Sequence, residues 1–108
     1  MANEIHVVDN SRIFLGALPE QIGQALEAIG LTAERYAKEI CPVDTGRLRA
    51  SISHARDDNA AYIGTNVEYA PYVELGTSMR RAKPYLRPAA EDHSDEYKEI
   101  ARMALRGK

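Results

Sequence analysis

The sequence has few of the residues and patterns that mark several common classes of protein. It contains no tryptophan and one cysteine, Cys41, so neither an internal disulfide nor a zinc site built from thiolates can form. No apolar run approaches the roughly 18 residues of a membrane-spanning helix, and residues 1–6 lack the basic start of a signal peptide. These absences predict a protein of a reducing cytoplasm that has no membrane partner.

An excess of charge of one sign is also lacking. Fourteen Lys and Arg residues face 16 Asp and Glu residues, and the resulting formal net charge of −2 argues against a general nucleic-acid-binding protein. The composition, 44% hydrophobic and 28% charged, is typical of a globular chain. A chain of 108 residues can bury about two-thirds of its unfolded surface in one core. We therefore predict a single domain over residues 1–108.

Two long helices are predicted. From Leu18 to Ile40, apolar residues recur at steps of three and four, and Pro19 suits the first helical position. Pro42 disfavours helical geometry in the residue before it, so this helix is expected to end at Cys41. The second helix is predicted from Pro88 to Arg106, where acidic residues precede basic ones in the order that the helix dipole favours.

A small antiparallel sheet is predicted between these helices. The turn Pro42-Val43-Asp44-Thr45-Gly46 is followed by apolar residues that alternate with polar ones up to His54, which is the pattern of a half-buried strand. One helical turn capped by Thr45 before the strand is the alternative. Residues 57–59 form a hairpin turn signal, and residues 60–65 fit the returning strand. Residues 4–8 fit a short strand or an ordered arm equally well.

A short helix and an extended segment complete the predicted fold. The segment from Tyr69 to Gly76 has a proline just inside its start and a glycine at its end, which is typical of a short helix. Pro84 and Pro88 favour an extended backbone over residues 83–86. We expect an α+β fold in which a small antiparallel sheet packs against a long N-terminal helix and a C-terminal helix, with a short helix between strands.

The sequence offers little catalytic chemistry. His6, His54 and His93 are far apart, and no pair has the spacing of a helical metal site. Phosphate-binding glycine loops and nucleophile elbows are missing as well. Cys41 could serve a small hydrolase as its nucleophile, but packing against the helix end is the simpler interpretation, and for His54 it is a structural, hydrogen-bonded role. We expect no enzyme, no cofactor and no metal.

One segment has charge of a single sign. Residues 76–87 contain four cationic side chains and no acid. We take these as candidates for contact with a neighbouring subunit or with DNA in a lumen: Arg80, Arg81, Lys83 and Arg87. In a head-to-tail contact, either arginine of the pair 80–81 would meet Glu91 or Asp95 of the next subunit. The alternative function is a small nucleic-acid-binding module that uses the same basic loop.

Three segments resemble the signatures of a tail-component family of tailed bacteriophages, named after the tenth gene product of a lambdoid Hong Kong phage. Residues 41–52 are similar to "Pro-Val-Asp-Thr-Gly-x-Leu-x-x-Ser-Ile", residues 64–77 to a strand followed by "Tyr-Ala-x-x-x-Glu-x-Gly-Thr", and residues 83–89 to an aromatic residue between prolines. The main residues that carry the resemblance are Pro42, Asp44, Thr45, Gly46, Tyr69, Glu74, Gly76, Pro84 and Pro88.

The resemblance covers residues 18–106 and leaves residues 1–17 as a variable N-terminal arm. It implies a virion structural protein of the siphophage neck and tail top, encoded by a phage or prophage and assembled in the host cytoplasm. Such a protein acts in head–tail joining or tail completion as a ring, typically of six subunits, with other neck and tail proteins and the passing DNA as partners. We also expect Glu74 to pair with Arg47 or Arg49, which would tie the short helix to the sheet.

Overall fold

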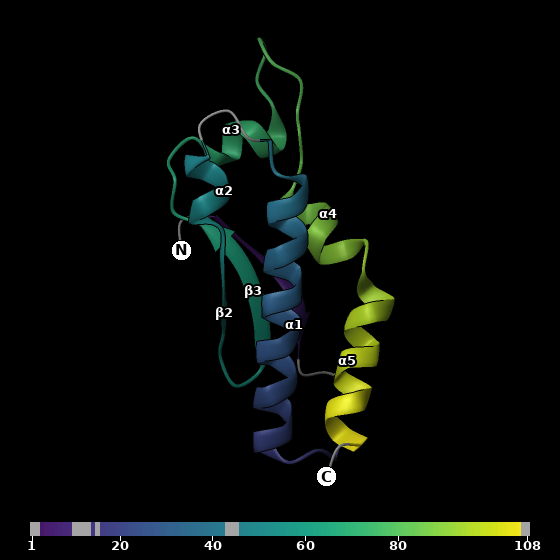
Figure 1. Ribbon diagram of the computed structural model, residues 1–108. Helices are drawn as coiled ribbons and strands as arrows, with labels where there is room; N and C mark the ends of the chain where they lie inside the picture. Colours follow the sequence, from purple (N-terminus) through teal and green to yellow (C-terminus); the bar gives the residue numbers. More distant parts are fainter. Residues whose placement is uncertain (1–2, 10–13, 15, 43–45, 107–108) are drawn as a thin grey trace.

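The computed structural model describes residues 3–9, 14, 16–42 and 46–106, and it confirms the α+β fold (Figure 1). Three antiparallel strands lie in the order β1-β3-β2, with the bounds β1 (Asn3–Asp9), β2 (Ser53–Arg56) and β3 (Ala60–Thr65). The helices are α1 (Pro19–Ile40), α2 (Arg47–Ser51), α3 (Ala70–Leu75), α4 (Leu86–Glu91) and α5 (Ser94–Arg106). Residues 4–8, for which a strand and an ordered arm were both possible, therefore belong to the edge strand β1.

Helix α1 forms the long axis of the molecule (Figure 1), and its bounds agree with the prediction to within one residue. Its first turn is fixed by Gln21, whose Oε1 accepts the N–H of Leu18 at 3.1 Å and whose Nε2 donates to the carbonyl of Leu105 at 3.3 Å. This second bond ties the start of α1 to the end of α5. The buried stripe of α1 follows the predicted helical spacing and consists of Ile22, Ala25, Leu26, Ile29, Gly30, Ala33 and Ala37.

The sheet packs one face against α1. In the central strand β3, Ile63 is fully buried and is opposite Ile5 of β1 and His54 of β2. Because side chains alternate along a strand, His54 lies on the helix-facing side. Tyr62 lies on the other face, where it is half-buried beside His6, with 5.4 Å between the ring centroids. The core lies between the sheet and the helices, and its largest fully buried side chains are Tyr85, Tyr97, Phe14, Leu26, Ile29, Ile52, Ile63 and Thr65.

The predicted strand over residues 47–54 is wrong in its first half. Residues 47–51 form helix α2, and β2 begins only at Ser53, so the helical alternative is the one observed. Leu48 and Ile52 are buried, whereas Ala50 between them is exposed. A strand would place all three on one face, but a helical turn brings only residues four apart together. The apolar spacing therefore fits both structures.

The predicted C-terminal helix is also wrong in part, because it consists of two helices. The break falls at Asp92 and His93, and α4 begins at Leu86, within the segment that we expected to be extended. The change of direction lets α4 cross the end of the fold while α5 runs beside α1 (Figure 1). In the break, His93 stacks on Tyr36 of α1, with 3.6 Å between the ring centroids.

Candidate functional site

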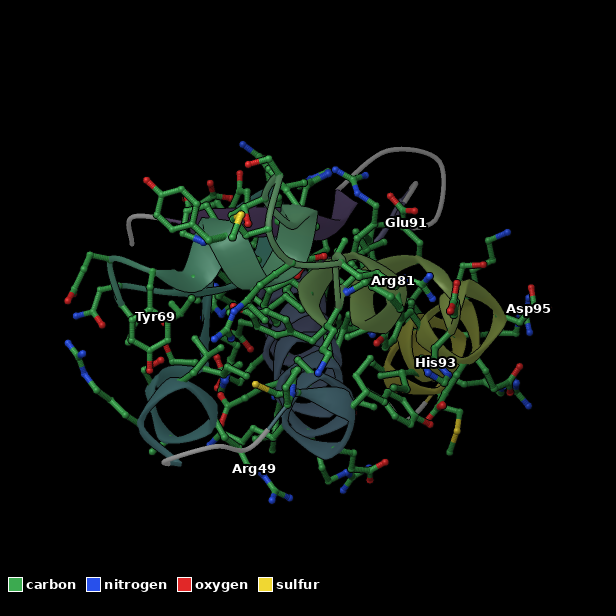
Figure 2. All side chains as sticks on the ribbon, turned by 90° about the horizontal axis from the view of Figure 1, so that it is seen from above. Arg49, Tyr69, Arg81, Glu91, His93 and Asp95 are labelled. Carbon is green, nitrogen blue, oxygen red and sulfur yellow. The ribbon has the colours of Figure 1, made fainter. Side chains whose placement is uncertain are left out.

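The end of the molecule at which α1 terminates carries most of the sequence-predicted contact residues. Figure 2 looks onto this end and shows Tyr69 on one side and Arg81 on the side of α4 and α5, together with Glu91, His93 and Asp95. The loop between α3 and α4 projects from this end (Figure 1). We call residues 76–83 the basic loop. It is the most prominent projection of the molecule.

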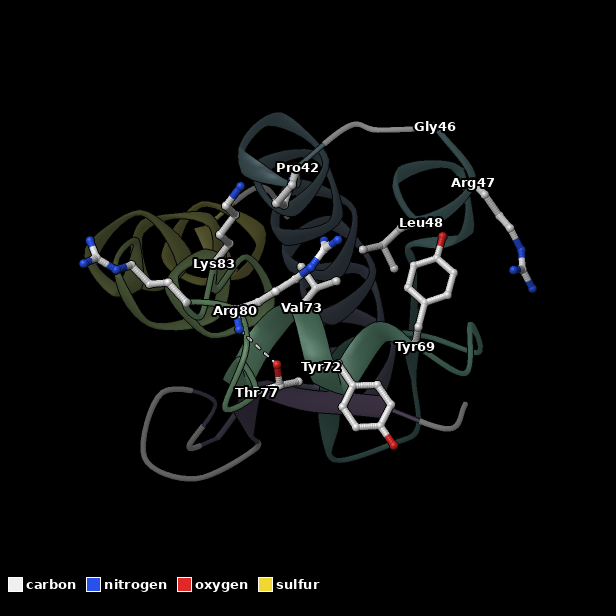
Figure 3. Close-up of a pocket in the computed structure, with 11 residues that line it drawn as sticks. Pro42, Gly46, Arg47, Leu48, Tyr69, Tyr72, Val73, Thr77, Arg80 and Lys83 are labelled. Atoms are coloured by element: carbon white, nitrogen blue, oxygen red, sulfur yellow. Dashed lines mark hydrogen bonds between the residues drawn. The ribbon is translucent and has the colours of Figure 1, made fainter.

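An open cleft of about 950 Å³ lies between α2, α3 and the basic loop (Figure 3). We call it the basic cleft. It is lined by Pro42, Gly46, Arg47, Leu48, Tyr69, Tyr72, Val73, Thr77, Arg80, Arg81 and Lys83. Figure 3 shows Leu48 and Val73 at its apolar floor, with the side chain of Arg80 reaching across it. Among the described residues that line the cleft, four are cationic and none is acidic, and this charge favours an anionic or acidic partner surface.

The basic loop is held in shape by a compact set of hydrogen bonds. Gly76 ends α3 with φ = +79°, a left-handed conformation that favours glycine. The Oγ1 atom of Thr77 accepts the backbone N–H of Met79 and of Arg80, both at 3.1 Å, which forms a tight turn. The N–H of Lys83 donates to the carbonyl of Val73 at 2.8 Å and ties the return of the loop to α3. The loop therefore presents its tip in a defined conformation.

Glu74 does not pair with Arg47 or Arg49 in the described residues, contrary to our expectation. Its Oε1 accepts the backbone N–H of Tyr85 at 3.1 Å and of Leu86 at 2.9 Å, and its Oε2 accepts that of Arg87 at 3.1 Å. These three N–H groups are the unsatisfied donors at the start of α4. A carboxylate from α3 therefore caps α4 across the chain, which joins the second signature to the third.

Arg47 has a different carboxylate partner. Its Nη2 atom lies 3.3 Å from Oε2 of Glu68, and its guanidinium carbon lies 5.5 Å from the ring centroid of Tyr69. This cation–π contact holds Tyr69 at the wall of the basic cleft. The ion pair is exposed on both sides and adds little stability.

The four predicted contact residues are not equivalent. Arg80, Arg81 and Lys83 line the basic cleft and form no ion pair within the described part of the chain. Arg87 lies on α4 instead, where its Nη1 atom is 2.9 Å from Oε2 of Glu91. Glu91, one of the two acids that we expected the next subunit's arginine to meet, is therefore paired within its own helix. The structure brings together three of the four cations and separates Arg87 from them.

The remaining signature residues have mainly backbone roles where the structure describes them. Asp44 and Thr45 lie outside the described residues. Gly46 precedes α2 with φ = +82°, again left-handed. Pro84 leads into α4, and the carbonyl of Pro88 accepts the N–H of Asp92 at 2.8 Å, which closes the last turn of that helix. The signature residues therefore mark turns and helix ends.

Sequence reasoning missed two of the exposed apolar residues at this end, Leu75 and Met79. Met79 at the tip of the basic loop is 89% exposed, and Tyr72 and Leu75 of α3 are exposed as well. The available signal was a methionine between polar and cationic neighbours, where a core role is unexpected. Apolar side chains beside unpaired cations are typical of a protein-contact surface.

Cys41 and His54, the two residues considered for catalysis or ligand binding, both have structural roles. Cys41 is buried, and burial raises the pKa of its thiol, which is the opposite of the activation that a cysteine nucleophile needs. His54 is half-buried and bridges two carboxylates of α1, Glu27 and Glu34, as expected for a structural histidine. Within the described ranges, no three His, Cys, Asp or Glu side chains gather to hold a metal. No described helix is both long and apolar enough to cross a membrane.

Comparison with models of protein families identifies a family to which this chain is similar. Residues 14–76, more than half of the chain, match the family described as "Bacteriophage HK97-gp10, putative tail-component". The matched region contains the first signature and the second as far as Gly76, and it includes α1, the sheet hairpin and α3. Comparisons with curated proteins and with solved structures gave no match. The family match does not extend to the third signature at residues 83–89. Over residues 14–76 the resemblance seen in the sequence is confirmed, and the chain belongs to the bacteriophage HK97 gp10 tail-component family.

Proposed function

We propose that this protein is a structural component of the neck or tail top of a siphophage or prophage particle. In this proposal it is a single domain that acts in head–tail joining or tail completion as a ring, typically of six copies, bound to other neck and tail proteins. The observation that carries the proposal is family membership, since the family is one of phage tail components. The assembled particle is its expected location, after synthesis in the host cytoplasm.

The surface at the loop end supports a role in contact rather than catalysis. It combines the exposed apolar side chains of Tyr72, Leu75 and Met79 with cations that lack partners in the described residues. A stable protein contact buries about 800 Å² on each partner and usually combines an apolar centre with a polar rim. The thiol of Cys41 is buried with a raised pKa, so it supports no hydrolase.

The test is deletion of the gene from the phage genome that encodes it, followed by electron microscopy of the particles. The proposal predicts DNA-filled heads and separate tails, with normal joining restored by the wild-type protein supplied in trans. The Lys98→Glu variant, a charge reversal at an exposed residue of α5, should restore joining equally well. Intact, infectious particles in the absence of the protein would contradict the proposal.

A further inference from the structure

We propose that the basic loop of one copy docks into an acidic groove of a second copy of the same chain. This inference rests on the proposed ring and names the two surfaces that would join its subunits. The groove runs between the first half of α1 and the turn that links β2 to β3, and it has a volume of about 800 Å³. It is lined by Pro19, Glu20, Gly23, Gln24, Glu27, Ala28, Leu31, Arg56 and Asp58.

The groove has an excess of acidic side chains that the described residues of its own chain do not neutralise. Arg56 is the one cation among the described lining residues, and its Nε atom lies 3.9 Å from Oε1 of Glu27. The other carboxylate oxygen of Glu27 lies 2.7 Å from His54. Glu20 and Asp58 form no ion pair with any residue that the structure describes. These two carboxylates give the groove its unbalanced negative charge.

The basic loop has the complementary charge. Arg80, Arg81 and Lys83 also form no ion pair among described residues. In the proposed contact, these three cations of one copy would meet the two unpaired carboxylates in the groove of the other. Opposite potentials of this kind fix the orientation of a contact and speed up encounter. A second copy of the chain is therefore a sufficient partner, because the loop supplies the positive charge and the groove supplies the negative charge.

The apolar parts of the two surfaces also match. Met79 projects from the loop tip, and the groove contains Leu31, which is 55% exposed, beside the small residues Gly23 and Ala28. An unbranched methionine adapts to an irregular apolar surface, and small residues leave room for it. An ideal Cβ on Gly23 would lie 3.3 Å from the guanidinium of Arg56, so a larger residue there would narrow the groove. Met79 and Leu31 are therefore the expected apolar centre of the contact.

The positions of the two surfaces require two copies. The basic loop lies beyond the C-terminal end of α1, whereas the groove follows its N-terminal half (Figure 1). From Leu31, the groove residue nearest the C-terminal end of α1, to Ile40 the helix rises about 14 Å at 1.5 Å per residue. The basic loop projects beyond that end, so it does not reach its own groove. A contact between two different surfaces is head-to-tail, and it closes into a ring when the rotation between copies permits.

Glu91 and Asp95 are the alternative acids for the loop. Glu91 is already paired with Arg87, and both acids lie on the same side of the molecule as Arg81 (Figure 2). A ring subunit needs two surfaces that face different neighbours. The groove, at the other end of α1, meets this requirement better than the neighbouring acids do.

The first test is intermolecular cross-linking between single-cysteine proteins in a Cys41→Ala background. A mixture of Met79→Cys and Leu31→Cys proteins at high concentration should form the mixed disulfide about tenfold faster than a mixture of Met79→Cys and Met103→Cys proteins. Met103 is a matched control, because it is 61% exposed and lies outside the groove. Equal rates in the two mixtures would overturn the proposal, even if the free protein is a monomer.

The second test exchanges the charges in the cross-linking pair. Arg80→Glu with Arg81→Glu in the Met79→Cys protein should lower the rate to that of the control. The addition of Glu20→Lys with Asp58→Lys to the Leu31→Cys protein should restore it. The proposal is wrong if Glu91→Lys with Asp95→Lys restores the cross-linking rate instead. It is also wrong if the loop variant keeps the cross-linking rate and loses only its binding to duplex DNA.

Particle assembly separates this inference from the proposed function. If particles need the protein but the double loop variant joins heads to tails normally, the structural role holds and the docking inference fails. If particles assemble without the protein, the proposed function fails, whatever the cross-linking shows.

Discussion

The Nδ1 atom of His54 on β2 lies 2.7 Å from Oε1 of Glu34 on α1, so this pair links the sheet to the long helix. The Nε2 atom of His54 lies 2.7 Å from Oε2 of Glu27, which precedes Glu34 by about two turns of α1. Partial burial alone lowers the pKa of His54, but the hydrogen bonds to Glu27 and Glu34 outweigh it and raise that pKa above its ordinary value of 6.5. For Glu34 the two effects have the opposite signs. Burial raises its pKa, but its hydrogen bonds to His54 and Lys38 outweigh burial and lower that pKa below its ordinary value of 4.5.

The pair predicts a defined dependence of stability on pH. The contribution of His54 is fully present below pH 6.5 and is lost as pH rises through its raised folded-state pKa. The contribution of Glu34 is present above pH 4.5 and is lost as pH falls through its lowered pKa. Urea unfolding at a series of pH values should show that His54→Gln removes the loss of stability on the alkaline side. Parallel pH profiles for the two proteins would contradict this account.

The cap formed by Glu74 predicts a marked effect of Glu74→Gln. A glutamine offers one oxygen where the carboxylate offers two, and its NH₂ group would face a backbone N–H at the start of α4. We expect the free energy of unfolding to fall by about 1–3 kcal/mol, measured by urea denaturation. Glu68→Gln is the control, because its ion pair with Arg47 is exposed on both sides and its loss should change the free energy of unfolding much less. Equal losses would show that the cap adds nothing.

Two buried tyrosines predict opposite results for the same substitution. The hydroxyl of Tyr97 donates to the carbonyl of Ala89 at 2.6 Å, so Tyr97→Phe leaves a buried acceptor unpaired and should cost about 1–3 kcal/mol. The hydroxyl of Tyr85 is buried and has no hydrogen-bond partner among the described residues. Tyr85→Phe should therefore leave the melting temperature unchanged or raise it. The idea fails if thermal unfolding ranks the two variants in the reverse order.

The helices and strands could be predicted from the sequence where the signal is local. The apolar stripe of α1, the proline before its end and the turn at residues 57–59 each depend on neighbours a few positions apart. Helix α2 was ambiguous because its apolar residues fit two periods, and only the exposure of Ala50 separates them. The start of α4 depends on Glu74, a residue more than ten positions earlier, so local propensity could not reveal it.

The candidate site was predictable in its charge but not in its geometry. Four cations without an acid are visible in the sequence as a run, yet the pairing of Arg87 with Glu91 appears only once α4 is formed. Glu20 and Asp58 line the same groove but are far apart in the sequence, so no sequence motif could identify the groove. Membership of a family added what periodicity and composition could not, namely the kind of particle to which the fold belongs.

Two left-handed glycines predict substitutions of unequal cost. Gly46 and Gly76 have φ values of +82° and +79°, so alanine is strained at both. Around Gly46 there is open space among the described atoms, but an ideal Cβ on Gly76 would lie 2.7 Å from the backbone nitrogen of Ala82. Gly46→Ala should cost about 1 kcal/mol, and Gly76→Ala should cost more and disturb the basic loop. Urea unfolding ranks the two, and an equal or smaller cost at Gly76 would contradict the packing described for the loop.

The claim that this protein is a building block of the phage particle is tested most directly by counting its copies in purified virions with quantitative mass spectrometry. The account predicts a small fixed number per particle, about six, in intact virions and in isolated necks or tails. Infectious particles purified from the same lysate that contain none of the protein would contradict it.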